Sequence, residues 1–275
     1  MTAPLIAALV LIGLLVGSFL NVVIHRVPRG ESIVTPASAC PGCGHPIRAR
    51  DNIPVLSWLV LRGRCRDCGE HISARYPFVE LGTGVLFTIV GVAFAPPVIS
   101  AGNPGAATAA VMALVAYLWL AGASVALAAI DLDVHRLPNV IVLPTLGVIG
   151  VLLGAASLLS GDWDAILRAL IGALAVGAIY FILAIAIPGG MGFGDVKLAP
   201  SLGLALAWLG WPHLVVGVIA GFLVGGFVGV GLIIARRAKR GSRIAFGPWM
   251  IVGAWIGILV GAPLAGAYLS LFGIG

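Results

Sequence analysis

The stretch AATAAVMALVAYLWLAGASVALAAID, residues 106–131, decides the fold class of this chain. It carries no charged side chain before Asp131, and it is longer than the roughly 20 apolar residues that an α-helix needs to cross a bilayer. The run therefore predicts a transmembrane helix over residues 106–130. It also places an acidic residue at the end of that helix, a position where a charge is expensive and usually functional.

Seven further apolar runs indicate that the whole chain is a membrane protein. They cover residues 4–24, 78–99, 138–159, 165–187, 195–210, 212–235 and 246–270. The chain is 60% hydrophobic and 9% charged, with a mean hydropathy of +1.13, whereas soluble domains carry about 25% charged residues. We expect an all-α polytopic membrane protein with about eight transmembrane helices in the lipid bilayer. Because the basic residues lie in short loops, we expect no nucleic-acid partner.

The basic residues predict how the helices are oriented. With eight spans and an outside N-terminus, 15 of the 16 lysines and arginines fall on one side, and only Arg168 falls on the other. Cytoplasmic loops are enriched in basic residues, so we expect loop 25–77 in the cytoplasm and the protein in a bacterial inner membrane. Arg26 and Arg29 follow the first run, which predicts a retained helix over 1–24 and not a cleaved signal.

The cytoplasmic loop contains all four cysteines, in two Cys-x2-Cys pairs separated by 21 residues: Cys40, Cys43, Cys65 and Cys68. Four thiolates at this spacing predict a closed tetrahedral Zn²⁺ site that stabilises a segment too polar to build its own core. Two disulfides are the alternative, which the reducing cytoplasm disfavours.

Residues beside the cysteines give this prediction its detail. Gly42, Gly44 and Gly69 permit the tight turns that direct two thiolates at one ion. His45 and His71 lie next to the pairs, so either histidine is an alternative ligand to a cysteine.

Two acids at helix ends predict an enzyme. Asp131 ends the run at 106–130, and Asp195, in GGMGFGDVKL (189–198), begins the run at 195–210, on the same predicted side of the membrane. Two carboxyl groups brought together share one proton, which is the requirement of an aspartyl protease: one carboxylate activates water and the other group polarises the scissile carbonyl. A glycine-rich loop with Asp195 as a simple helix cap is the alternative.

The neighbours of these acids leave choices open. Asp133 competes with Asp131, but two residues correspond to about 200° around a helix, so both cannot face Asp195. Gly189, Gly190, Gly192 and Gly194 leave room for a substrate backbone. Lys197 either pairs with one of the acids or extends to the membrane boundary.

The chain resembles the type IV prepilin peptidases, which are G-x-G-D intramembrane aspartyl proteases. Six segments carry the resemblance: GSFLNVVIHRVP (17–28), the two cysteine pairs, ISARYPFVEL (72–81), IDLDVHRLPN (130–139), GMGFGDVKL (190–198) and IAFGPW (244–249), where Ala245 replaces the family's proline. The family's first catalytic motif, an Asp followed seven residues later by Pro and then Asn or Asp, matches Asp131 through Pro138 and Asn139. The second motif gives Asp195, with Gly192, Gly194 and Lys197 beside it.

The resemblance implies a bifunctional enzyme. Members cut the leader from prepilins and pseudopilins after a glycine at the cytoplasmic membrane face, and many then methylate the new N-terminal residue with S-adenosylmethionine. The methyl transfer goes with the cysteine-bearing domain, in which Gly63-Arg64 stands where the family has Gly-Lys. Glu80 either contacts the new amine of the substrate or is a structural partner of Arg75.

These inferences divide the chain into a first transmembrane helix (1–24), a zinc-binding, methyltransferase-associated domain (25–77) and a transmembrane aspartyl peptidase domain (78–275). Three alternatives stay open: a peptidase whose cysteine domain is purely structural, an ion-coupled transporter, and a zinc-stapled scaffold without catalysis. A transporter predicts acids near the bilayer midplane and an inverted repeat, and the sequence contains neither.

Overall fold

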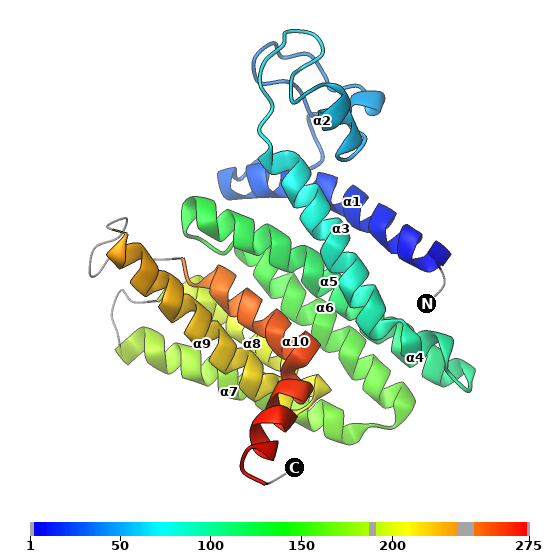
Figure 1. Cartoon of the computed structure of the whole chain (residues 1–275), viewed down its shortest axis with the longest axis vertical. Helices are drawn as coiled ribbons and strands as arrows, with labels where there is room; N and C mark the ends of the chain where they lie inside the picture. The colour runs from blue at the N-terminus through cyan, green and yellow to red at the C-terminus, as the bar shows by residue number, and fades with distance from the viewer. Residues whose placement is uncertain (1–2, 187–190, 236–244, 274–275) are drawn as a thin grey trace. The chain divides into compact units, whose positions relative to one another are not determined.

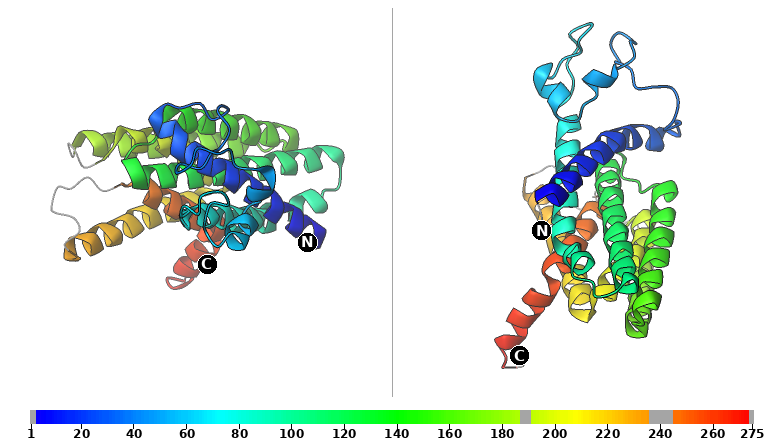
Figure 2. Two further views of the ribbon diagram at one scale, coloured as in Figure 1. Left: turned by 90° about the horizontal axis from the view of Figure 1, so that it is seen from above. Right: turned by 90° about the vertical axis from the view of Figure 1, so that its right-hand side faces the viewer.

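The computed structural model describes residues 3–186, 191–235 and 245–273. Within these ranges the chain is helical and forms no strand, as the composition predicts; only two isolated bridges occur, both in the cysteine loop. The chain divides into two compact units, residues 1–96 and 97–275. Figures 1 and 2 show the helices of each unit.

The first unit consists of a helix pair and the loop between its members. Helices α1 (Ala3–Arg26) and α3 (Arg75–Phe94) pack against each other, and the loop adds η1 (Val27–Arg29), η2 (Ala49–Asp51) and the short α2 (Leu56–Val60). Glycines make the close packing possible: a Cβ atom at Gly17 would lie 2.7 Å from the Cα of Glu80, and one at Gly13 would lie 2.7 Å from the Cα of Gly84. Small residues at such crossings allow membrane helices to approach closely.

The second unit is a bundle of six long helices: α5 (Pro104–Val134), α6 (Asn139–Ser160), α7 (Trp163–Ala186), α8 (Phe193–Leu209), α9 (Trp211–Ile234) and α10 (Gly247–Ser270). Helix α8 is the core of this bundle, because α6, α7, α9 and α10 all pack against it. From Leu198 to Ala207 every residue of α8 except Pro200 is buried. Glycines again permit the contacts, at Gly172 against Gly203 and at Gly221 against Gly253.

Seven of the described helices are long and apolar enough to cross a membrane. Helix α8, which corresponds to the predicted run at 195–210, has 17 residues and is therefore about 25 Å long, less than the roughly 30 Å of a hydrocarbon core. The eight long helices otherwise follow the eight predicted runs closely. Seven of these eight long helices are therefore candidate membrane spans, and the eighth, α8, is enclosed by protein.

Two helices differ from the predicted runs in where they start or end. The run at 78–99 was too long: α3 ends at Phe94, and the prolines that follow begin the separate short helix α4 (Pro96–Ile99). The run at 106–130 was too short, because α5 starts at Pro104, after an Asn103 side chain that accepts a hydrogen bond from the backbone N–H of Ala106 (2.8 Å), and continues to Val134. It ends where His135 adopts a left-handed conformation, with φ of 52°. Both acids of the IDLDV segment are therefore helical.

Candidate active site and cysteine cluster

Asp131 lies in the penultimate turn of α5 with its side chain buried. It is 4% exposed, whereas Asp133 is exposed to solvent. Two residues correspond to about 200° of helical rotation, so the bundle-facing side of α5 selects Asp131 and directs Asp133 outward. The family motif points to Asp131 through Pro138 and Asn139. Asp131 is also the acid that the helix geometry directs toward the bundle.

Asp195 lies in the first turn of α8 and is 5% exposed. Its carboxylate accepts a hydrogen bond from the backbone N–H of Gly192 (3.2 Å), and its own N–H donates to the Gly192 carbonyl (3.0 Å). Gly192 is the N-cap residue and Asp195 is the third helical residue, whose carboxylate completes a capping box, so Asp195 does cap the helix start although it is not the N-cap residue itself. The reciprocal bonds fix the carboxylate at the helix start while leaving its Oδ1 atom available. Gly189 and Gly190 lie outside the described residues.

The two carboxyl groups meet at the first residue of α10. A Cβ atom placed on Gly247 would lie 2.8 Å from Asp131 Oδ2 and 3.3 Å from Asp195 Oδ1, so the sum of these distances is the upper limit on the separation of the two oxygens. The Gly247 backbone N–H is close enough to interact with the Asp131 carboxyl group, but Asp131 Oδ2 has no hydrogen-bond partner of good geometry among the described residues. Three helices thus contribute to one site.

The segment between α5 and α6 packs against both motifs. Buried Leu137 lies under the glycine-rich turn, where a Cβ atom on Gly194 would be 2.9 Å from that of Leu137. Pro138 is the N-cap residue of α6. The Asn139 side chain accepts a hydrogen bond from the Lys197 ammonium group (3.0 Å), which links the first motif to the second. Lys197 therefore has a defined polar partner, and that partner is an amide, not one of the two acids.

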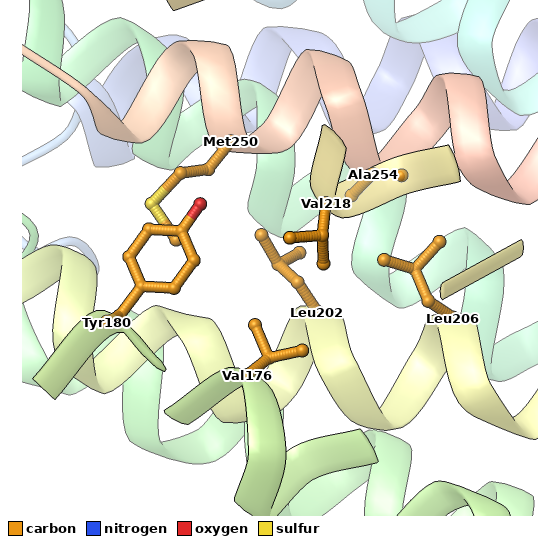
Figure 3. A pocket seen from close by; sticks show the side chains of 8 residues that line it. Val176, Tyr180, Leu202, Leu206, Val218, Met250 and Ala254 are labelled. Atoms are coloured by element: carbon orange, nitrogen blue, oxygen red, sulfur yellow. The ribbon is translucent and has the colours of Figure 1, made fainter. Parts of the chain in front are cut away.

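An aromatic cluster anchors the start of α10. Phe246, the N-cap residue of α10, packs against Tyr180 of α7 and Phe222 of α9, with ring centroids 6.1 and 5.7 Å away. Tyr180 and Phe222 stack at 5.3 Å. Tyr180 also lies at one end of a small apolar cavity between α7, α8, α9 and α10 (Figure 3). The sequence did not single out Tyr180 or Phe222, because neither belongs to a motif.

The four cysteine sulfur atoms of the first unit gather in one cluster. All four Sγ atoms lie within 4.8 Å of one another, and those of Cys40 and Cys68 are 3.7 Å apart. This agrees with the roughly 3.8 Å between sulfurs that bind one ion tetrahedrally at Zn–S distances of about 2.3 Å. No disulfide joins the four thiols, so the disulfide alternative is wrong. Among the described residues, the cluster of potential metal ligands contains neither His45 nor His71.

The two cysteine pairs adopt the same backbone conformation. The N–H groups of Cys40 and Cys65 donate to carbonyls five residues later (3.0 and 2.8 Å), and the N–H groups of Gly44 and Gly69 donate back to those cysteines (2.8 and 3.0 Å). Gly44 and Gly69 have positive φ angles of 72° and 75°, as the tight turns require. Gly42 has another role, since its Cβ would contact the Glu70 side chain at 3.2 Å.

Backbone amides around Cys40 favour its thiolate. The backbone N–H of Cys43, followed by that of Gly42, lowers the Cys40 pKa to about 7. A thiolate is the form that binds a metal ion, so the turn favours Cys40 as a donor, whereas desolvation and the neighbouring thiols raise the pKa values of Cys43 and Cys68.

The three residues suggested for methyl transfer have structural contacts. Buried Glu80 accepts a hydrogen bond from the backbone N–H of Val55 (2.7 Å), where Val55 has a positive φ of 62° and begins α2. Gly63 also has a positive φ (67°), and a Cβ there would lie 2.9 Å from the Trp58 ring. Arg64 forms an isolated bridge with His71, beside the third cysteine. Glu80 thus has a backbone partner that the sequence did not reveal.

Comparisons with known proteins agree with this architecture. The model of the bacterial peptidase A24 N-terminal domain matches residues 11–94, and that of the type IV leader peptidase family matches residues 114–230. A prepilin leader peptidase/N-methyltransferase of Aeromonas hydrophila is 40% identical over 95% of this chain and 93% of its own length. Relatives of the same description from Pseudomonas aeruginosa and Burkholderia pseudomallei are each 34% identical, over 96% and 99% of this chain and 93% and 90% of their own lengths.

No solved structure matches the chain. The sequence relatives cover almost all of both chains, and the two family models lie one in each compact unit. On these grounds the chain belongs to the type IV leader peptidase family.

Proposed function

We propose that this protein is a prepilin leader peptidase that uses Asp131 and Asp195 as its catalytic pair, and that it N-methylates the product. The observation that carries the proposal is the convergence of two buried carboxyl groups, from α5 and α8, on the first residue of α10. Ionisable groups at such positions are costly and mark functional sites. Membership of the family supports prepilins or pseudopilins as the substrates.

The chemistry follows from a pair of carboxyl groups that shares one proton. The ionised carboxylate removes a proton from water, whose oxygen forms a new bond to the scissile carbonyl carbon. The protonated carboxyl group meanwhile donates a hydrogen bond to the carbonyl oxygen. Collapse of the tetrahedral intermediate breaks the C–N bond, and the leaving amine takes up a proton. Because the pair titrates as a unit, neither residue has a fixed role before substrate binds. Gly192, Gly194, Lys197, Pro138 and Asn139 hold the two motifs in place.

The first unit is proposed to bind a structural zinc ion through its four cysteines. The ion supplies no chemistry to peptide cleavage; it joins the two cysteine turns of the proposed domain 25–77, between the helix 1–24 and the peptidase domain 78–275. We assign S-adenosylmethionine-dependent methyl transfer to the unit that contains this domain, with Gly63, Arg64 and Glu80 near the site. We place the protein in the bacterial inner membrane, with both activities on the cytoplasmic side.

Leader cleavage tests the catalytic pair. The protein is co-expressed with a prepilin, and cleavage is followed by gel mobility for the wild type and for Asp131→Asn, Asp195→Asn and Asp133→Asn. Both single variants of the pair should leave the prepilin uncut, whereas Asp133→Asn should cut it, because Asp133 faces solvent. Full processing by Asp131→Asn or Asp195→Asn would sink the assignment. Mass spectrometry of the cleaved N-terminus then tests methylation: a product that gains no methyl group with S-adenosylmethionine present would remove that activity.

A further inference from the structure

We infer that Gly247 is a positioning residue whose missing side chain provides the space in which the two carboxyl groups meet; the inference rests on the proposed catalytic pair. A Cβ atom at residue 247 would lie 2.8 Å from Asp131 Oδ2, 3.3 Å from Asp195 Oδ1 and 3.2 Å from Leu137 Cδ1. The first distance is closer than side-chain carbons approach other atoms. The φ of Gly247 is not positive, so a left-handed backbone is not what excludes alanine there.

The backbone at Gly247 has little freedom to move away from the carboxyl groups. Phe246, immediately before it, is held in the cluster with Tyr180 and Phe222. Behind Phe246 lies α9, where a Cβ atom on Gly225 would already be 2.6 Å from the Phe246 ring. Gly247 is itself buried. Protein interiors are close-packed and transmit such strain to their neighbours.

The carboxyl groups must therefore move away from residue 247, because the backbone cannot. Asp195 is held through its Oδ2 by the Gly192 N–H. Asp131 Oδ2, the nearer atom, has no hydrogen-bond partner of good geometry in the described parts of the chain. A methyl group at residue 247 should thus rotate Asp131 away from Asp195 and separate the pair. A displacement of about 1 Å at a catalytic group can cost about 100-fold in rate.

The matched variants are three glycine-to-alanine changes on the same helix. Gly247→Ala adds a methyl group between the carboxyl groups. Gly253→Ala adds one against the backbone of Gly221 in α9, at a packed position away from the acids. Gly266→Ala adds one where nothing lies within 4 Å. The purified full-length variants are compared by kcat and KM for prepilin cleavage and by thermal unfolding.

The expected result for Gly247→Ala is a fall in kcat of about 10- to 100-fold, with KM within about twofold of the wild type, because substrate binding elsewhere is untouched. Gly266→Ala should leave kcat and KM unchanged and should not lower the unfolding temperature, because alanine forms helix better than glycine. Gly253→Ala should lower the unfolding temperature while its folded fraction keeps the wild-type kcat. A wild-type kcat in Gly247→Ala, or a loss explained by its unfolded fraction alone, would overturn the inference.

A double-mutant cycle, measured by unfolding temperature, tests the contact even if Gly247→Ala is poorly folded. Asp131→Ala removes the crowding oxygen, so Gly247→Ala should lower the unfolding temperature much less in an Asp131→Ala background than in the wild type. Equal effects in both backgrounds would refute the contact. Activity in Asp131→Asn or Asp195→Asn would instead refute the catalytic pair itself, so the two failures can be told apart.

Discussion

Removing the proposed zinc ion from the cysteine cluster should unfold the loop that contains it. Between Glu31 and Ala74 only Cys40 and Gly63 are buried, so the loop has no apolar core. A core of this size rarely supplies more than about 3–5 kcal/mol even when it is well formed. A structural zinc ion in a small domain contributes roughly 10–16 kcal/mol of apparent binding free energy at pH 7. Metal binding therefore contributes more free energy than the packing of the loop, and the loop without its metal should be unfolded.

Acidification should have the same effect as a chelator. The folded-state pKa of Cys40 is lowered to about 7 from an ordinary value of 9.0. The sign follows from linkage: a group with a lowered folded-state pKa contributes stability that is fully present above its unfolded pKa and is lost as the pH falls through the folded value. Metal and protons also compete for the same thiolates. Metal content should thus fall as the pH is lowered.

Limited trypsin digestion with a metal assay measures both effects. Between Glu31 and Ala74 the loop contains five arginines that trypsin should cut only after unfolding: Arg48, Arg50, Arg62, Arg64 and Arg66. Chelator treatment, pH 5 and Cys40→Ser should each release the metal and expose these sites, while Ser38→Ala, which keeps all four thiols, should match the wild type. A metal-free protein with an unchanged digestion pattern would refute the reasoning.

Three further predictions concern other contacts. Lys197→Met should slow leader cleavage a few-fold with little loss of stability, because an exposed bond to Asn139 contributes under about 1 kcal/mol; an unchanged cleavage rate would contradict a role in joining the motifs. Gly203→Ala should cost about 1–3 kcal/mol of stability by overpacking α7 against α8, measured by denaturant unfolding, and an unshifted midpoint would contradict that packing. Glu80→Gln should keep the metal and the trypsin resistance, since its amide oxygen still accepts from Val55, whereas Glu80→Ala should lose both; equal behaviour of the two variants would contradict the proposed bond.

The site residues that the sequence identified belong to patterns within short stretches of the chain. Asp131 and Asp195 are acids at the ends of apolar runs, and the four cysteines have the spacing of a metal site. The contacts that it missed depend on segments far apart in the chain. Gly247 belongs to a recognised motif, but its contact with both acids arises only when α5, α8 and α10 meet. Likewise, the Glu80–Val55 bond joins residues 25 positions apart, and hydropathy measures how apolar α8 is without saying what surrounds it.

The enclosure of α8 has a consequence for how a substrate reaches Asp195. Because α6, α7, α9 and α10 all pack against this helix, a peptide moving within the lipid cannot dock along its sides. The accessible part of α8 is its first turn, where Phe193 is 66% exposed beside the Gly192 cap. If Asp195 is catalytic, as proposed, the scissile bond is expected to reach it at that turn. The buried part of α8 is held in place by its neighbouring helices. Under the proposed function, substrate and product exchange only at its first turn.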